Sequence, residues 1–305
     1  MSSELTRRTL FGVIAAPIVV GILIVGDAAL AGLVAIASAL AAWEFFRLAR
    51  ASGLNPLDDL GIVMAGLIPL LVHARYRGLY DPNGAIGPLS LAGLVVILLF
   101  TVAIWARGVD GKPMGAVAST ALGAGYSGGL LSFAYAIRYH EYAFAPAALT
   151  IGGWTTSVPS GALLVLLPVL LTWASDIGAF AVGRTMGRNK LIPSVSPGKT
   201  VEGAVGGLVA CMALAWIYAH FVLRPATHLD FRWAPLGALA FGALASVAAQ
   251  AGDLAESLLK REGHVKDSSH LIPGHGGVLD RIDSLFFVLP VAYVALNLML
   301  TWSPT

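Results

Sequence analysis

The chain has 305 residues, of which 57% are hydrophobic and 12% are charged, whereas soluble domains carry about 25% charged residues. This composition excludes a soluble enzyme, a disordered chain and a coiled coil, and it predicts a protein with several membrane spans. A net charge of +2 argues against nucleic-acid binding, and the single cysteine, Cys211, excludes a disulfide or a cysteine metal site within one chain.

Apolar stretches of about 20 residues, the length that crosses the hydrocarbon core as a helix, recur along the whole chain. The first begins after Arg7 and Arg8, but its apolar run is longer than that of a signal peptide, so we expect a retained helix. We predict an all-α, polytopic integral membrane protein with a single membrane-embedded domain over residues 1–305. The nine predicted spans are 9–26, 28–48, 57–73, 89–106, 114–137, 161–182, 201–223, 234–259 and 285–302.

Basic residues are distributed unevenly between the two sets of loops. If the N-terminus faces the cytoplasm, fourteen of the 19 Lys and Arg residues fall on that side. Because cytoplasmic loops carry the excess of Lys and Arg, we predict a cytoplasmic N-terminus and an external C-terminus. The compact chain without long tails leads us to expect a bacterial plasma membrane. The five basic residues on the other side are Arg75, Arg77, Arg138, Arg224 and Arg232.

The first polar segment, residues 176–203, follows from the sixth predicted span. Asp176 lies inside that span, where a carboxylate costs about 2.5–3.5 kcal/mol, which favours function over an ion pair made for packing. Pro197 and Gly198 predict a turn, and Lys199 then stands where a helix N-terminus attracts anions. The glycine spacing excludes a P-loop. A phosphate-binding helix start is one interpretation, and positive-inside charge with a capping hydroxyl is the other. Glycines suited to close helix packing follow: Gly203, Gly206 and Gly207.

The second polar segment, residues 253–283, begins on the eighth span. Its first polar residues recur at i, i+3, i+4 and i+7, the spacing of one helix face. They are Asp253, Glu256, Ser257 and Lys260. The alternative is a helix end that snorkels at the interface, but a short aspartate below apolar turns cannot reach far. Both polar segments are predicted to lie on the cytoplasmic side.

An irregular loop is predicted in the same segment, because proline and glycine let its backbone approach a ligand closely. The residues concerned are Pro273, Gly274, Gly276 and Gly277. Asp280 and Asp283 follow one helical turn apart, and their hard oxygens suit Mg²⁺. The histidines lack the spacing of a zinc site. We expect His264 and His270 to be solvated, and His275, between glycines, to have a functional role.

Together the polar segments resemble the sequence signature of the phosphatidate cytidylyltransferases, the CDP-diacylglycerol synthases. All signature positions match over residues 257–283. They are Ser257, Leu259, Lys260, Arg261, Lys266, Asp267, Ser269, Ile272, Pro273, His275, Gly276, Gly277, Val278, Asp280, Arg281, Ile282 and Asp283. Residues 196–203 also resemble the family, except that Gly198 replaces a second lysine and Val201 replaces an aromatic residue that members often have.

The resemblance implies an Mg²⁺-dependent, often dimeric membrane enzyme that converts CTP and phosphatidate to CDP-diacylglycerol and pyrophosphate. It also implies that Asp253 and Asp280 hold the metal centre. This centre contains Mg²⁺, and the resemblance leaves open whether a second metal ion is present. We expect in-line attack at the α-phosphate of CTP, in which the protein mainly positions and neutralises its substrates. The expected catalytic residues are Asp253, Lys260, Arg261, Lys266, Asp280 and Arg281. The expected substrate-binding residues are Ser257, Lys199, His275, Gly276, Gly277, Asp176 and Asp283.

Three other classes of function are compatible with parts of the pattern: another CTP-using lipid enzyme, a transporter and a non-catalytic homologue. A cytidylyltransferase for a different lipid phosphate, or a CTP-dependent polyprenol kinase, would need similar polar clusters, but the signature favours phosphatidate. A transporter would use Asp176 and Asp253 as ion ligands, but the sequence shows no internal repeat. A non-catalytic homologue is disfavoured by the intact set of carboxylates and cations.

Overall fold

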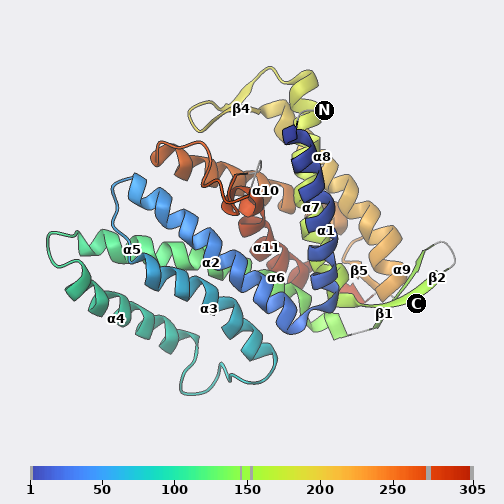
Figure 1. Ribbon diagram of the computed structural model, residues 1–305. Coiled ribbons are helices and arrows are strands. Elements are labelled where there is room, and N and C mark those ends of the chain that lie inside the picture. Colours follow the sequence, from blue (N-terminus) through green and yellow to red (C-terminus); the bar gives the residue numbers. More distant parts are fainter. Residues whose placement is uncertain (1–2, 145, 152–153, 273–275, 303–305) are drawn as a thin grey trace. The chain divides into compact units, whose positions relative to one another are not determined.

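The computed structural model describes residues 3–144, 146–151, 154–272 and 276–302, and the chain folds mainly into helices (Figure 1). Its contacts divide it into two compact units. The first unit contains the residues up to Val13, Asp27–Tyr135 and Leu259–Arg281. The second contains Ile14–Gly26, Ala136–Leu258 and the residues from Ile282 onward. The single domain over residues 1–305 stays a prediction.

Helices and short strands follow one another along the chain. The α-helices are α1 (Ser3–Val25), α2 (Asp27–Ala51), α3 (Asp58–Tyr76), α4 (Pro88–Ala106), α5 (Pro113–Ala124), α6 (Phe133–Arg138), α7 (Ser160–Met186), α8 (Val201–Tyr218), α9 (Arg224–Thr227), α10 (Leu236–Glu262) and α11 (Leu279–Met299). Two π-helical turns, η1 (Gly125–Gly129) and η3 (Ala219–Leu223), and a 3₁₀ turn, η2 (Glu141–Phe144), complete the helical part. The strands are β1 (Pro146–Ile151), β2 (Trp154–Pro159), β3 (Lys190–Ile192), β4 (Ser196–Thr200), β5 (Leu229–Phe231) and β6 (Leu300–Trp302).

Within the described residues, 7 helical segments are long and apolar enough to cross a membrane. They are α2, α3, α4, α7, the stretch Val201–Thr227, α10 and α11. This architecture fits a polytopic membrane protein. The other two predicted spans correspond to α1 and to the consecutive segments α5, η1 and α6. The number nine stays a prediction.

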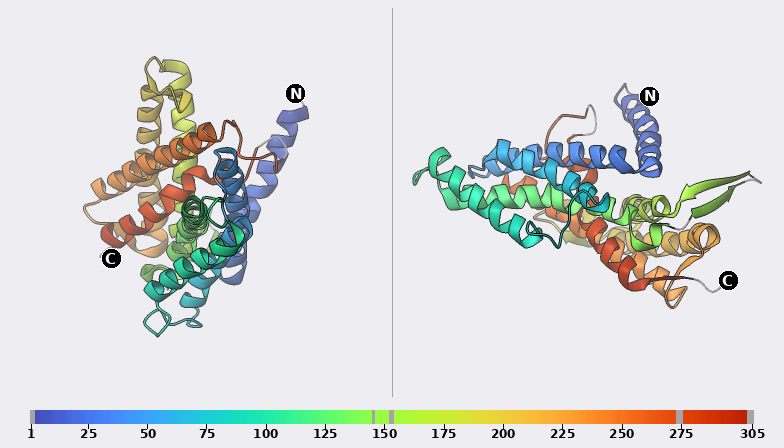
Figure 2. Two further views of the ribbon diagram at one scale, coloured as in Figure 1. Left: turned by 90° about the vertical axis from the view of Figure 1, so that its left-hand side faces the viewer. Right: turned by 90° about the horizontal axis from the view of Figure 1, so that it is seen from below.

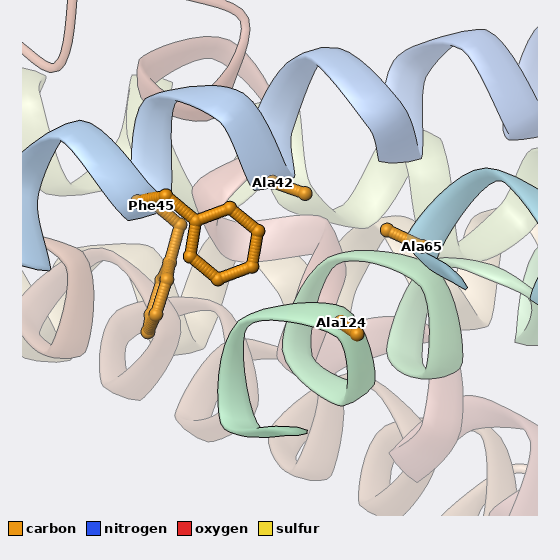
Figure 3. Close-up of a cluster of buried hydrophobic side chains, with 5 residues drawn as sticks. Ala42, Phe45, Ala65 and Ala124 are labelled. Atoms are coloured by element: carbon orange, nitrogen blue, oxygen red, sulfur yellow. The ribbon is translucent and has the colours of Figure 1, made fainter. Parts of the chain in front are cut away.

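Helices α2, α3 and α5 of the first unit meet through small and aromatic side chains. Figure 3 shows Ala42 and Phe45 of α2 together with Ala65 of α3 and Ala124 of α5, all of them buried. Small residues let helix backbones approach closely, which is how helices in a membrane gain packing contacts. This packing fixes the C-terminal half of α2, and with it Glu44, against α3 and α5.

Helices α7 and α8 of the second unit pack backbone to backbone at glycines. A Cβ on Gly203 would lie 2.8 Å from the carbonyl oxygen of Ala179, and one on Gly207 would lie 2.8 Å from that of Ser175. The predicted close packing at these glycines is therefore confirmed. Thr200 caps the start of α8, because its Oγ1 accepts a hydrogen bond from the N–H of Gly203 at 3.1 Å.

In the part of the chain that the structure describes, three antiparallel two-stranded sheets accompany the helices, and the sequence did not predict them. Strands β1 and β2 form a hairpin that extends away from the helices of the second unit (Figure 2). Strands β5 and β6 join Leu229–Phe231 to Leu300–Trp302, and β3 pairs with β4. Such short strands depend on contacts with the rest of the fold, which periodicity within one segment does not reveal.

The turn expected at Pro197 and Gly198 is wrong, because both residues lie in β4 and the chain turns at residues 193–195. The cause lies at the start of α8. The carboxylate of Glu202 accepts hydrogen bonds from the N–H of Arg188 at 3.1 Å and from the side-chain amide of Asn189 at 2.7 Å. These bonds hold the residues before β3 against the end of β4, so the hairpin reverses at its far end.

Candidate active site

Asp280, on the first turn of α11, accepts hydrogen bonds at both of its carboxylate oxygens from described residues of the first unit. Its Oδ1 accepts from Nζ of Lys260 at 2.8 Å. Its Oδ2 accepts from the N–H of Gly277 at 2.8 Å, and from the N–H and the hydroxyl of Ser268 at 3.0 and 2.9 Å. The Asp280 side chain is 5% exposed, so its carboxylate organises the residues around it instead of facing solvent.

The signature loop (residues 263–278) connects α10 to α11 and closes on itself. The N–H of Ile272 donates to the carbonyl oxygen of Gly276 at 2.9 Å. Gly276 has φ +82°, a conformation that favours glycine, and a Cβ there would lie 2.7 Å from Oδ2 of Asp280. The irregular, glycine-dependent loop is therefore confirmed in its described part. His275, predicted to bind substrate, lies outside the described residues, as do Pro273 and Gly274.

A carboxylate that the sequence reasoning missed borders the same loop. Glu44 lies on α2 and is 0% exposed. The rule that singled out Asp176, that a carboxylate inside an apolar span is costly, applies equally to Glu44 and would have found it. Its four donors are the hydroxyls of Ser268 and Ser269 and the N–H groups of Val278 and Leu279, at 3.0, 2.5, 3.0 and 2.6 Å.

In the second unit, Asp253 on α10 pairs with the lysine at the end of β4. Nζ of Lys199 lies 2.5 Å from Oδ2 of Asp253, and the hydroxyl of Ser257 lies 3.5 Å from Oδ1. The two charged side chains are 27% and 32% exposed, so water reaches them. The predicted capping hydroxyl is confirmed and belongs to Thr200, the residue after Lys199. The ammonium group of Lys199 pairs with the carboxylate of Asp253. The helix face predicted from Asp253 to Lys260 does belong to one helix, α10.

A cavity of about 470 Å³ opens beside this pair in the second unit. Its charged lining consists of Asp176 and Arg184 from α7 with Lys199 and Asp253. The other lining residues include Ser175, Thr200 and Gln250 and the small residues Ala179, Gly183, Gly198, Gly203 and Ala204. Cations and carboxylates on the walls of one cavity can bind a polyanion together with a cation. Asp176 is thereby placed with the predicted site residues of this unit.

The remaining predicted cations lie at the surface: Arg261, Lys266 and Arg281 are exposed. Asp283 lies one turn after Asp280 on α11, as predicted, and its Oδ1 accepts a hydrogen bond from the N–H of Ser284 at 2.6 Å. The structure thus pairs two of the predicted lysines, Lys199 and Lys260, with carboxylates.

The carboxylates suit a hard cation. Among the described residues, no three His, Cys, Asp or Glu side chains gather into a group that could hold a metal ion. Mg²⁺ does not require such a group, because it commonly takes one or two carboxylates and completes its shell with water and substrate phosphates. Asp253, half-buried at a cavity, and Asp280, whose Oδ1 accepts a hydrogen bond from Lys260, fit that donor chemistry.

Comparison with known proteins agrees with the signature. A sequence profile of the cytidylyltransferase family matches residues 6–299. The chain is 33% identical over 304 residues to the phosphatidate cytidylyltransferase of Synechocystis sp., with 97% of each chain covered. It is 30% identical over 296 residues to that of Bacillus subtilis, covering 97% of this chain and 98% of the relative. A stretch of 134 residues, 43% of this chain and 44% of the relative, is 47% identical to the Haemophilus influenzae enzyme of the same name. The resemblance is confirmed, and the chain belongs to the cytidylyltransferase family.

Proposed function

We propose that this protein is a phosphatidate cytidylyltransferase, which transfers CMP from CTP to phosphatidate and releases pyrophosphate. The observation that carries the proposal is the cavity beside Asp253, whose walls hold Lys199 and Arg184 together with two carboxylates. Both substrates are polyanions, and such a lining suits phosphate groups accompanied by a cation. Relatives that match almost the whole chain carry the same name.

In the proposed reaction, a phosphate oxygen of phosphatidate attacks the α-phosphorus of CTP. A new P–O bond forms while the bond from the α-phosphorus to the oxygen that bridges to the β-phosphate breaks. Pyrophosphate leaves with that electron pair. The attacking phosphate monoester is already ionised at pH 7, because its second pKa is about 6, so no side chain has to remove a proton. The protein contributes positioning and charge stabilisation.

The cationic side chains differ in how they would bind and neutralise the phosphate groups. Lys199 binds phosphate as a point charge, and Arg184 can grip two phosphate oxygens at once. Lys260 is engaged by Asp280 and keeps that carboxylate in place. The three exposed cations, Arg261, Lys266 and Arg281, neutralise further phosphate charge. Ser257, Asp176, Asp283, His275 and the glycines Gly276 and Gly277 complete the proposed substrate-binding residues.

We assign the metal-binding role to Asp253 in the second unit and to Asp280 in the first, because each offers carboxylate oxygens that would suit Mg²⁺. When bound, the ion supplies positive charge to phosphate oxygens. Oδ2 of Asp280 accepts hydrogen bonds from Ser268 and Gly277, and Oδ1 accepts one from Nζ of Lys260. Lys260 therefore keeps the carboxylate neutralised when the ion is absent.

The same proposal places the enzyme in a bacterial plasma membrane with its active site toward the cytoplasm, where CTP is made. The excess of Lys and Arg in the loops predicted to be cytoplasmic supports this orientation. The family resemblance supports a homodimer, which cross-linking in detergent and in membranes would reveal as a band of twice the chain mass.

The reaction is tested with purified, detergent-solubilised protein by measuring pyrophosphate release. We expect release that needs both CTP and phosphatidate and that stops when EDTA removes the metal. Diacylglycerol, a polyprenol and ATP serve as controls, because a kinase would release CDP instead of pyrophosphate. Pyrophosphate release only with another lipid, or no release with any lipid, would contradict the proposal.

A further inference from the structure

The carboxylate of Glu44 is fully occupied by donors of the signature segment. Each of its two oxygens accepts one hydrogen bond from a serine hydroxyl and one from a backbone N–H. A carboxylate has about four lone-pair sites, so this set fills them. Burying a carboxylate is unfavourable unless it is hydrogen-bonded. The buried charge of Glu44 on α2 therefore depends on the donors of residues 268–279, and the conformation of these residues depends on Glu44.

Two of the four donors belong to the start of α11. The first N–H groups of a helix have no acceptor within the helix, and a negative group there interacts favourably with the helix dipole. For Val278 and Leu279 the acceptor is Glu44, which lies 234 and 235 positions earlier in the chain. Glu44 thus fixes the turn on which Asp280 lies.

The hydroxyl of Ser268 lies between the carboxylates of Glu44 and Asp280, which share its single hydrogen. Its Oγ lies 3.0 Å from Oε2 of Glu44 and 2.9 Å from Oδ2 of Asp280. Gly277 fills the space beside it, because a Cβ at that position would overlap Oγ of Ser268 and both carboxylate oxygens of Glu44. Glu44 and Asp280 therefore hold the signature loop at Ser268 and again at its C-terminal end.

We propose that Glu44 is a positioning residue for the cytidylyltransferase reaction, an assignment that rests on the proposed function. Glu44 acts through its hydrogen bonds to the signature loop and to the start of α11, and it thereby sets the place of Asp280 and Lys260. The four donors are satisfied only by two acceptor oxygens in this geometry. A neutral amide would turn an NH₂ group toward two of them, and alanine would leave all four without their acceptor.

The test compares Glu44→Ala and Glu44→Gln with the wild-type protein and with Ser38→Ala. Ser38 is a suitable control because it is also 0% exposed on α2. Two readouts are used: kcat and KM for CTP from pyrophosphate release, and hydrogen exchange of the amides of Val278 and Leu279 by mass spectrometry. The second readout needs neither substrate nor metal.

For Glu44→Ala we expect kcat to fall about 100-fold, the effect of a small misplacement in an active site. The KM for CTP should stay within about twofold, since no substrate contact is removed. Exchange at the two amides should rise about tenfold on loss of their acceptor. Glu44→Gln keeps one acceptor oxygen, so its kcat and its amide exchange rates should lie between those of Glu44→Ala and the wild type. Ser38→Ala should match the wild type in both readouts.

Two results would overturn the proposal. Faster exchange with an unchanged kcat would show that Glu44 holds the loop without serving the reaction. Loss of kcat without faster exchange would show that it acts by another route. A wild-type protein that releases no pyrophosphate would reject the proposed function, whereas unchanged exchange in Glu44→Ala would reject the anchoring itself, so the two failures can be told apart.

Discussion

Asp280 accepts hydrogen bonds from the ammonium group of Lys260 and from neutral donors of Ser268 and Gly277, so both its negative charge and its two acceptor oxygens matter. In Asp280→Asn the amide nitrogen must face either Lys260 or the donors at Oδ2. Removing one partner of a buried ion pair costs about 3–5 kcal/mol, and these two side chains are only 15% and 5% exposed. We expect turnover to fall to background and the melting temperature to drop.

Pyrophosphate release and thermal unfolding in detergent check this expectation. Asp110→Asn is the matched control, because Asp110 is an exposed aspartate in the turn between α4 and α5. It should keep the wild-type rate and melting temperature. A well-folded Asp280→Asn protein with wild-type turnover would remove Asp280 from the site.

Lys199 and Lys190 lie on the two strands of one hairpin, β4 and β3, and allow a predicted site residue to be compared with a surface residue of the same type. Lys199 lines the cavity and contacts Asp253, whereas Lys190 is exposed on β3. A hydrogen bond to a charged group is worth about 1.5–3 kcal/mol, so we expect Lys199→Ala to raise the KM for CTP about tenfold or more. Lys190→Ala should leave the KM unchanged. Equal KM values for the two variants, from initial rates over a range of CTP concentrations, would refute a phosphate contact by Lys199.

At the scale of elements, glycine at the α7–α8 contact predicts a stability effect. A Cβ on Gly207 would lie 2.8 Å from the carbonyl oxygen of Ser175, whereas one on Gly93 of α4 meets nothing within 4 Å. Overpacking costs about 1–3 kcal/mol, so Gly207→Ala should lower the melting temperature. Gly93→Ala should leave it unchanged or raise it, since alanine is the better helix former. Thermal unfolding followed by circular dichroism distinguishes the two, and equal melting temperatures would contradict close packing at Gly207.

The long helices could be predicted from the sequence because a run of apolar residues is a local property. The predicted span 161–182, for example, became α7 (Ser160–Met186). The β3–β4 hairpin could not be predicted in the same way, because it is held by Glu202 reaching back to residues 188 and 189.

In the candidate site, too, the sequence predicted which residues belong to it but not their long-range contacts. The signature identified Lys260 and Asp280 as site residues, the family resemblance added Asp253 just before the signature, and the pattern of the other polar segment added Lys199. It did not show that the lysines pair with the aspartates, since pairing depends on which strand or helix is packed nearby. Glu44 was missed for a related reason: its partners lie 224 or more positions away, although its place inside an apolar span was visible.

At the scale of the whole molecule, the number of membrane crossings decides on which side each polar segment lies. The segment formed by α5, η1 and α6 is the critical one, because it is divided into short helical pieces. A π-helical turn such as η1 keeps its N–H groups bonded within the chain, and such local adjustments are tolerated in spanning helices. We therefore expect this segment to cross, as the predicted span 114–137 requires.

Single cysteines placed in two turns test the crossing and the orientation together. Asn83 is exposed between α3 and α4, and Ser194 is exposed between β3 and β4. In a Cys211→Ala background, Asn83→Cys should react with a membrane-impermeant maleimide on intact cells, and Ser194→Cys should react only after permeabilisation. The spans α4, α5–η1–α6 and α7 separate the two positions, so they lie on opposite sides only if α5–η1–α6 crosses. Labelling of both cysteines from one side would show that this segment does not cross, and labelling of Ser194→Cys alone from outside would invert the proposed orientation. Labelling as expected would place the β3–β4 hairpin and Lys199 on the cytoplasmic side, where CTP is available.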